Sequence, residues 1–335
     1  MTLNDEMTKY LCRMTSARHS FLSVVNVIQS SRQTRELSAW LTGLYTELKV
    51  QFSDFEFVLV NNHCDQALID EVITPLPEDL RKNIFLLNLS APVSRDNALL
   101  AGLDRANGDY TVIFEFDFSG KPQLVTQLWE HSQTGADIVY LRAAERRLPL
   151  ANRLLYKVFY FIMQRYSGLR LDPRAHHTRI ISRRALNSLL RLRENSHYLK
   201  ANYALVGYNT AWLDVDEPLY PDPEATFGRQ FRTSLVAITS FTTFLRTLLL
   251  WVFLFSVIVA GVAIFNAIKV KLTNVDIFGE HVTSSLTGWA SLVVLMSVFF
   301  AITCLNLYIM SIYLSNIYSE IKNRPLYIIE SVKRY

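Results

Sequence analysis

Thr111–Pro122, with the sequence Thr-Val-Ile-Phe-Glu-Phe-Asp-Phe-Ser-Gly-Lys-Pro, decides how the rest of the chain is interpreted. Its apolar start, Val112 to Phe114, predicts a buried strand that reaches the edge of a sheet. Glu115 and Asp117 are two residues apart, so an extended backbone would point both carboxylates to one face. Such a pair can hold Mg²⁺ or Mn²⁺ against a diphosphate. The alternative is an edge strand whose acids are only solvated.

Composition argues against several classes of protein. The chain has 335 residues, enough for one large domain and an appendage. Its net charge is only +4 and its basic residues form no long runs, which argues against nucleic-acid binding. Three cysteines that lie far apart favour a reducing compartment over a disulfide framework. Residues 1–19 lack the apolar centre of a signal peptide, so we expect what precedes the first membrane segment to stay in the cytoplasm.

Strands and helices are predicted to alternate, which is typical of an α/β domain with a mainly parallel sheet. The predicted strands are Phe21–Gln29, Phe55–Val60, Ile84–Leu89, the acidic segment, Asp137–Leu141 and Ala211–Asp216. The predicted helices are Ser30–Lys49 and Arg95–Ala106, and Arg179–Arg193 is expected to turn from strand into helix. Ligands of such sheets bind beyond the carboxyl ends of strands, where Asn61, Asn62, Glu115 and Asp117 are expected.

Two apolar segments follow residue 240. Thr247–Ile268 has no charged residue and, at about 1.5 Å per residue, is long enough to cross a bilayer. A second uncharged run contains the expected span Trp289–Ile312. Flanking cations favour a hairpin with both ends inside. We therefore predict an N-terminal extension (1–20), a cytoplasmic domain (21–228), an amphipathic helix (229–246), two spans (247–268 and 289–312) around an external loop (269–288), and a cytoplasmic tail (313–335).

Leu148–Tyr166 is predicted to be a helix rich in aromatic and basic residues. One hypothesis places it in the membrane interface, with its cations toward anionic headgroups. The other buries it against the rest of the domain.

Several short segments carry a resemblance to a known family. They are Asn97–Asp109, Ser182–Leu186, Val206–Tyr208, Ile238–Phe241 and Tyr318–Tyr327. From Phe21 onward the chain resembles membrane-anchored family 2 glycosyltransferases with a GT-A fold, of the bactoprenol glucosyltransferase and dolichol-phosphate mannose synthase branch. The resemblance implies inverting transfer of a sugar from a nucleotide sugar to a polyprenyl phosphate such as undecaprenyl phosphate. It also implies Mg²⁺ or Mn²⁺, the inner membrane, a homo-oligomer, and a role in cell-surface polysaccharide or lipopolysaccharide modification.

The resemblance also assigns roles to individual residues. Metal binding falls on Glu115 and Asp117, and the donor is assigned to Asn61, Asn62, Arg95 and Glu115. The catalytic set is Asp117, Arg179 and Glu194, and the candidates for the lipid phosphate are Arg142, Arg146 and Arg179, because guanidinium groups match phosphate geometry.

The chain also departs from the family pattern. Val27–Ser31 replaces Pro-x-Tyr-Asn-Glu, Asn61–Cys64 replaces Asp-Asp-Gly-Ser, and Ser119–Pro122 replaces Gln-Asp-Pro-Pro, so a usual metal ligand is missing. Lys121 would bring a positive charge near the site instead, and His63 is either a replacement ligand or a solvated turn residue. The leading hypothesis is an active transferase with an altered donor pocket. The alternatives are a non-catalytic binding or partner subunit and, more weakly, a transporter subunit, since the spans carry no charge.

Overall fold

The computed structural model describes residues 19–145, 150–192, 198–219, 227–275, 277, 287–322 and 324–335. The chain divides into two units. The first, which contains the sheet, runs to Tyr160 and adds Leu169–Thr233 and Arg324–Tyr335. The second consists of Phe161–Gly168 and Ser234–Asn323.

The first unit is built on an eight-stranded mixed sheet in the order β7-β5-β6-β4-β1-β2-β3-β8. The strands are β1 Leu22–Ile28, β2 Phe55–Asn61, β3 Ile84–Leu89, β4 Tyr110–Ile113, β5 Ile138–Ala143, β6 Ala175–Ser182, β7 Thr210–Val215 and β8 Ile329–Arg334. Strands β3, β2, β1 and β4 are parallel, β6 is antiparallel to β4 and β5, and β7 is parallel to β5. The predicted α/β class is therefore confirmed.

Helices cover both faces of this sheet, which explains why β1 is buried along its whole length and β2 at every residue except its first. One core contains side chains of α2 (Ser31–Gln51), α3 (Gln66–Ile73), α4 (Glu78–Arg81) and α6 (Gln123–Ser132). The other contains side chains of α5 (Arg95–Arg105), α8 (Arg183–Arg191) and α9 (Leu199–Leu205). Alternate residues of the central strands β1 and β2 contribute to the two cores, as the pleat requires.

Close packing fixes α5 against the parallel strands. Its N-cap is Ser94, whose side chain accepts a hydrogen bond from the backbone N–H of Asn97. A Cβ on Gly102 would lie 2.5 Å from Cγ1 of Val25 and 2.9 Å from Cγ2 of Val60, so only glycine allows this approach. The first residue of α5, Arg95, is thereby held at the carboxyl edge of the sheet.

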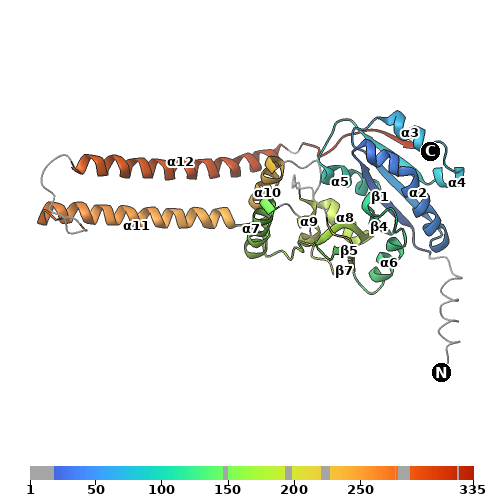
Figure 1. The fold of residues 1–335 in the computed structure, drawn as a ribbon, viewed down its shortest axis with the longest axis horizontal. Coiled ribbons are helices and arrows are strands. Elements are labelled where there is room, and N and C mark those ends of the chain that lie inside the picture. The colour runs from blue at the N-terminus through green and yellow to red at the C-terminus, as the bar shows by residue number, and fades with distance from the viewer. Residues whose placement is uncertain are drawn as a thin grey trace, which may run out of the picture. The chain divides into compact units, whose positions relative to one another are not determined.

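The end of the chain forms a strand of the sheet. Strand β8 pairs antiparallel with β3, and Figure 1 shows it in red along that edge. The side chain of Asn88 on β3 donates to the Ser331 hydroxyl at 3.0 Å, and Lys333 forms an ion pair with Asp70 of α3 at 2.7 Å. The predicted tail therefore includes a strand. Because β8 lies far from the other strands in the sequence, the sequence alone did not indicate that it pairs with β3.

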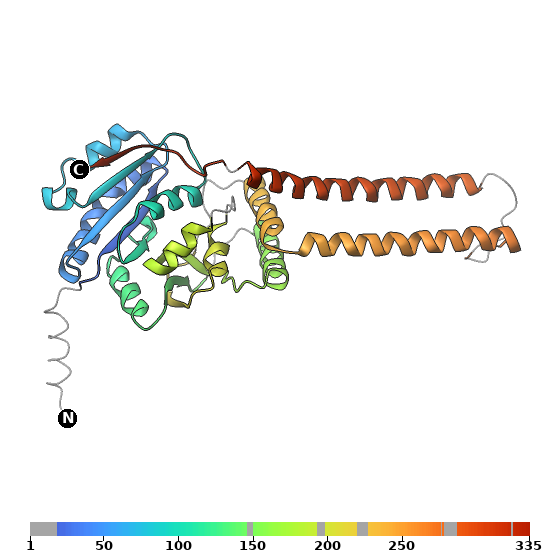
Figure 2. The same ribbon diagram turned by 180° about the vertical axis from the view of Figure 1, so that it is seen from behind.

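The second unit contains the two longest helices, α11 (Phe244–Thr273) and α12 (Thr287–Ile321), which lie side by side in Figures 1 and 2. Both contain segments long and apolar enough to cross a membrane, Phe244–Thr273 and Leu292–Ser315. Each extends beyond the span predicted from sequence. Helix α7 (Leu150–Tyr166) ends in this unit. The unit also contains the C-terminal half of α10 (Phe227–Phe241).

Candidate functional site

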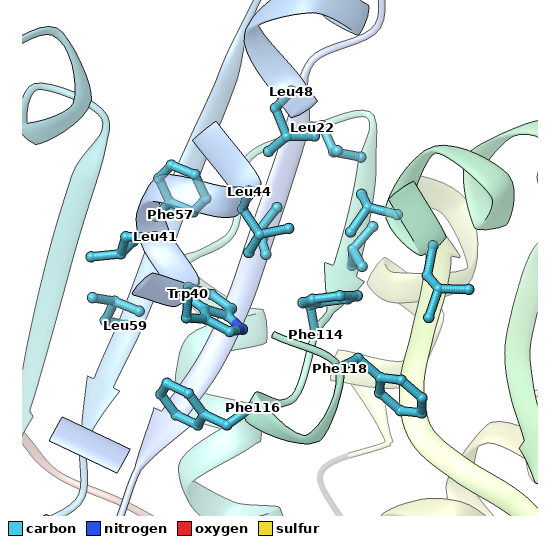
Figure 3. Packing of buried hydrophobic residues seen from close by; sticks show 14 of the residues in the cluster. Leu22, Trp40, Leu41, Leu44, Leu48, Phe57, Leu59, Phe114, Phe116 and Phe118 are labelled. Carbon is cyan, nitrogen blue, oxygen red and sulfur yellow. The ribbon is translucent and has the colours of Figure 1, made fainter. Parts of the chain in front are cut away.

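The acidic segment follows β4 and is anchored by its aromatic residues. Phe114, Phe116 and Phe118 are buried, and they alternate with the two acids. The Trp40 ring of α2 lies 6.3 Å from that of Phe114 and 5.5 Å from that of Phe116. Figure 3 labels these three rings in the core. This aromatic packing fixes the backbone between the phenylalanines. The intervening acids are therefore held at the carboxyl edge of the sheet.

The backbone of this segment is not the strand predicted from sequence. Strand β4 ends at Ile113, Glu115 is extended, and residues Phe116–Phe118 form one turn of 3₁₀ helix. The expectation that an extended backbone places both acids on one face was therefore wrong. Glu115 is buried, with 4% of its surface exposed, whereas the side chain of Asp117 is 69% exposed. The turn, not the pleat, sets their directions.

A histidine from β6 joins the two acids. Nδ1 of His176 lies 3.6 Å from Oε2 of Glu115, and its Nε2 lies 3.7 Å from Oδ2 of Asp117. The His176 ring packs edge-on against Phe118 at 4.7 Å. One ligand atom from each of the three residues lies within 4.8 Å of the others. The carboxylates are therefore brought together through a side chain of the neighbouring antiparallel strand.

This donor set fits a divalent cation. Carboxylate oxygens suit Mg²⁺ and Mn²⁺, and an imidazole nitrogen is a general ligand for transition metals. The backbone of Glu115 is also fixed to β6, because its N–H donates a hydrogen bond to the hydroxyl of Thr178 at 3.2 Å. Among the described residues, Glu115, Asp117 and His176 would hold such an ion, with Asp117 as the most accessible ligand.

Cations surround the two acids. Nη2 of Arg95 donates to Oε1 of Glu115 at 2.5 Å. His176 holds the pKa of Asp117 below its usual value against the opposing effect of burial, and Arg95 and Arg32 act in the same direction. Asp117 therefore stays ionised over the whole physiological range. This is the form that a metal ion or a basic group requires.

The side chains of Asn61, the last residue of β2, and Asn62, the next residue, form hydrogen bonds within the protein. The Asn61 amide donates to the carbonyl of Cys64 and to Oδ1 of Asn88, and its oxygen accepts from the Cys64 N–H. Asn62 exchanges two hydrogen bonds with the backbone of Val93 in the loop before α5. Both side chains therefore shape the edge of the sheet. The neighbouring His63 has a positive φ of 66°, as a tight turn requires.

Arg179 is buried beside the acids. Its guanidinium donates to the carbonyls of His176 and His177, at 2.8 and 3.1 Å, and lies 3.9 Å from the ring centroid of Tyr203. Among the described residues, no carboxylate lies within ion-pairing distance of it. Nζ of Lys200 on α9 donates to the carbonyl of Ala175 at 2.7 Å. Two cations thus flank the start of β6.

These cations affect their neighbours. Burial, with the charges of Lys200, Arg95 and Arg179, holds the pKa of His177 well below its usual value, so this imidazole is neutral. Asp96 accepts a hydrogen bond from the N–H of Leu199 at 2.9 Å, which ties α5 to α9. Burial raises the pKa of Asp96. The charges of Arg95, Arg179 and Lys200 therefore act on both His177 and Asp96.

Other residues expected at the site are placed differently. Nε of Arg142 lies 3.1 Å from Asp172 and 3.9 Å from Asp214, so two carboxylates already compensate its charge. Lys121 forms an ion pair with Glu217. Two expected site residues, Arg146 and Glu194, lie outside the described residues, as does the start of the segment 148–166.

Sequence reasoning missed His176, His177 and Lys200. The predicted strand began at Arg179, whereas β6 begins at Ala175 and carries the His-His pair next to the acids. Two adjacent histidines before an Arg-containing strand were the available signal, and their partner acids lie more than fifty residues earlier in the chain.

Comparison with known proteins gives this site a context. Residues 35–190, which include Glu115, Asp117 and His176, match the family model described as Glycosyl transferase family 2. This match covers 156 residues, a little under half of the chain. The predicted family resemblance and the GT-A fold class are therefore confirmed.

The similarity to individual proteins extends beyond residues 35–190. An uncharacterized glycosyltransferase of Synechocystis sp. is 26% identical over 318 residues, which cover 93% of this chain and 95% of that protein. The prophage bactoprenol glucosyl transferase homolog of Escherichia coli (strain K12) is 27% identical over 253 residues, or 74% of this chain and 79% of that protein. The crystal structure of glucosyl-3-phosphoglycerate synthase from M. tuberculosis is 13% identical, covers 71% of this chain and 83% of that one, and has a TM-score of 0.44.

Proposed function

We propose that this glycosyltransferase moves a sugar from a nucleoside diphosphate donor to a polyprenyl phosphate at the cytoplasmic face of a membrane. The observation that carries the proposal is the convergence of Glu115, Asp117 and His176 beside Arg95 at the carboxyl edge of the sheet. This arrangement can receive a diphosphate. The names of the bactoprenol glucosyl transferase relatives support the choice of a polyprenyl acceptor.

The donor end has to stabilise a departing nucleoside diphosphate. Bound Mg²⁺ or Mn²⁺ would neutralise part of the charge that develops on the diphosphate. Arg95 is placed to donate hydrogen bonds to the same group, since its guanidinium already reaches Glu115. Asp117 contributes the exposed carboxylate that holds the donor complex in position. The donor pocket differs from those with Asp-Asp after the second strand, because Asn61 and Asn62 carry no charge.

The acceptor end has to bind a lipid phosphate. Arg179 is a buried guanidinium without a carboxylate partner among the described residues, and a buried cation is stable only with compensation. A phosphate oxygen entering beside Arg179 and Lys200 would supply it. That oxygen attacks the anomeric carbon as the bond to the donor phosphate breaks, which inverts the configuration. Since the phosphate is already ionised near neutral pH, no strong general base is required.

The membrane anchor follows from α11 and α12. We infer that both cross the bilayer, since each contains an apolar segment of sufficient length. Strand β8 follows α12 and belongs to the same sheet as β1 to β7, so the chain must return to the side from which it left. Helix α7 adds exposed apolar residues at Leu154, Val158 and Phe161, one helical face, with Arg153 and Lys157 nearby. This favours contact of α7 with anionic lipid.

A second candidate is a non-catalytic relative that acts as a binding or partner subunit. The observation in its favour is that the side chains of Asn61 and Asn62, at the carboxyl end of β2, both form hydrogen bonds within the protein. The nucleoside end of the site would then have lost its polar groups. A non-catalytic relative of this kind would keep the fold but form no glycolipid.

One experiment separates the two candidates. The full chain, purified in detergent, is incubated with Mn²⁺, undecaprenyl phosphate and a panel of nucleotide sugars, and glycolipid is followed by mass spectrometry. The proposed function predicts product with one donor, lost in Asp117→Asn and retained in Asp79→Asn, a matched change on exposed α4. Absence of product and of nucleotide binding with every donor would favour the non-catalytic candidate. A reporter fused after Tyr335 should appear cytoplasmic; a periplasmic signal would contradict the hairpin.

A further inference from the structure

One carboxylate oxygen of Glu115 is hydrogen-bonded within the protein, and the other faces a ring nitrogen of His176. Its Oε1 accepts a hydrogen bond from Arg95 at 2.5 Å, and its Oε2 lies 3.6 Å from Nδ1 of His176. Since the carboxylate is buried, water contributes little to its solvation. A buried carboxylate needs a compensating charge, and in the protein without ligands Arg95 supplies it.

Arg95 differs from the other partners of Glu115 because it can leave. Its side chain is 30% exposed, and it lies on the first residue of α5 at the edge of the sheet. His176 and Thr178, in contrast, are buried on β6 and fixed by the strand. A guanidinium also matches the paired oxygens of a diphosphate, so an arriving ligand can replace the carboxylate as its partner.

We propose that Arg95 takes the place of the divalent cation at Glu115, and that a nucleoside diphosphate draws it away so that metal and nucleotide bind cooperatively. The inference rests on the proposed function, which puts a cation at Glu115, Asp117 and His176. Such a cation would share Glu115 with Arg95, and the two positive charges would repel each other. A diphosphate removes this repulsion, because it accepts bonds from both. The metal alone therefore binds weakly.

The coupling is reciprocal. If the nucleotide strengthens metal binding by some factor, the metal strengthens nucleotide binding by the same factor. Couplings of this kind are typically about 5–150-fold. Replacement of Arg95 by glutamine removes the competing charge, so the ligand-free variant should bind the metal more tightly than the wild type. Nucleotide should also increase the Mn²⁺ affinity of this variant much less than that of the wild type, because Arg95, the side chain that moves, is absent.

The test measures Mn²⁺ affinity by the electron paramagnetic resonance signal of free Mn²⁺, using the full chain in detergent. Wild type, Arg95→Gln and Lys82→Gln are titrated alone and with UDP or GDP, after correction for Mn²⁺ bound by the nucleotide itself. Lys82 is an exposed cation before β3, at the opposite end of that strand from the loop that leads to Arg95, so Lys82→Gln controls for the loss of one charge.

We expect Arg95→Gln without nucleotide to bind Mn²⁺ about tenfold more tightly than wild type, and Lys82→Gln to match wild type. Equal or weaker Mn²⁺ affinity of folded Arg95→Gln would overturn the inference. If that variant does not fold, wild-type affinity that is the same with and without nucleotide overturns it. Failure of every protein to bind Mn²⁺ under any condition would instead overturn the proposed metal site itself.

Discussion

The turn after β2 and the segment after β4 lie at the same edge of the sheet, but their polar side chains do different things. Where β2 passes into the turn, Asn61 and Asn62 are buried, and their side-chain amides donate hydrogen bonds to other parts of the chain. After β4, the carboxylate of Asp117 is exposed, and His176, Arg95 and Arg32 lie near it. A position at the carboxyl end of a parallel strand is therefore not enough to make a ligand-binding residue. The side chain must also be left available by its neighbours.

The largest expected effect comes from removing the available carboxylate. Asp117→Asn keeps the shape of the side chain but removes the charge that holds the donor complex. We expect glycolipid formation to fall by about 10³-fold. The midpoint of thermal unfolding at pH 7 should fall by only a small amount, because Asp117 is an exposed residue. An active variant, or one that is unfolded, would contradict the assignment of Asp117 to the site.

A smaller effect is expected at His176, which contributes one of three ligand atoms. His176→Gln should weaken Mn²⁺ binding by at least about tenfold, measured in the presence of nucleotide. The matched control is His131→Gln, on the exposed side of α6, which should bind Mn²⁺ like wild type. Unchanged affinity in His176→Gln would limit the site to the two acids.

Substitution of Asn61 should lower the stability of the protein, whereas substitution of Asp117 mainly lowers its activity. Asn61→Ala leaves the Cys64 N–H and Oδ1 of Asn88 without their partner, and we expect a loss of about 1–3 kcal/mol in the free energy of unfolding. Thermal and chemical unfolding of the detergent-solubilised protein measure this. If Asn61→Ala were as stable as wild type but failed to bind nucleotide, the side chain would be a direct contact and the contrast with Asp117 would disappear.

The smallest effect concerns acid stability. Because the pKa of Asp117 is lowered in the folded protein, its ionised form stabilises the fold above its unfolded pKa of about 3.9. This contribution is lost as pH falls through the lower folded value. The stability difference between wild type and Asp117→Asn should therefore be present at pH 7 and shrink below about pH 4. A difference that grows in acid would mean that the carboxylate is repelled by its surroundings.

Local patterns were sufficient to predict the sheet domain. Apolar runs of strand length gave β1, β2 and β3 almost to the residue, and recurrence at three and four gave α2. The Phe-Glu-Phe-Asp-Phe alternation correctly placed the acids at the edge of the sheet. It could not show the 3₁₀ turn, because burial of three aromatic rings around Trp40 depends on tertiary packing.

Contacts between distant parts of the chain could not be predicted in the same way. His176 meets the acids only because β6 is antiparallel to β4, and one chain gives no signal of that pairing. Strand β8 follows both long helices and pairs with β3. Its sequence is short and has no clear strand pattern, so this segment was predicted to be a tail. The hydrogen bonds that occupy Asn61 and Asn62 likewise come from β3 and from the loop before α5.

We propose that Glu115, Asp117 and His176 together hold the cation that binds the donor diphosphate. Pulsed electron paramagnetic resonance of the full chain with Mn²⁺ and UDP or GDP tests it most directly. The account predicts coupling of Mn²⁺ to one protein nitrogen and to phosphorus, with the nitrogen coupling lost in His176→Gln. Bound Mn²⁺ that shows phosphorus coupling but no nitrogen coupling in the wild type would contradict it.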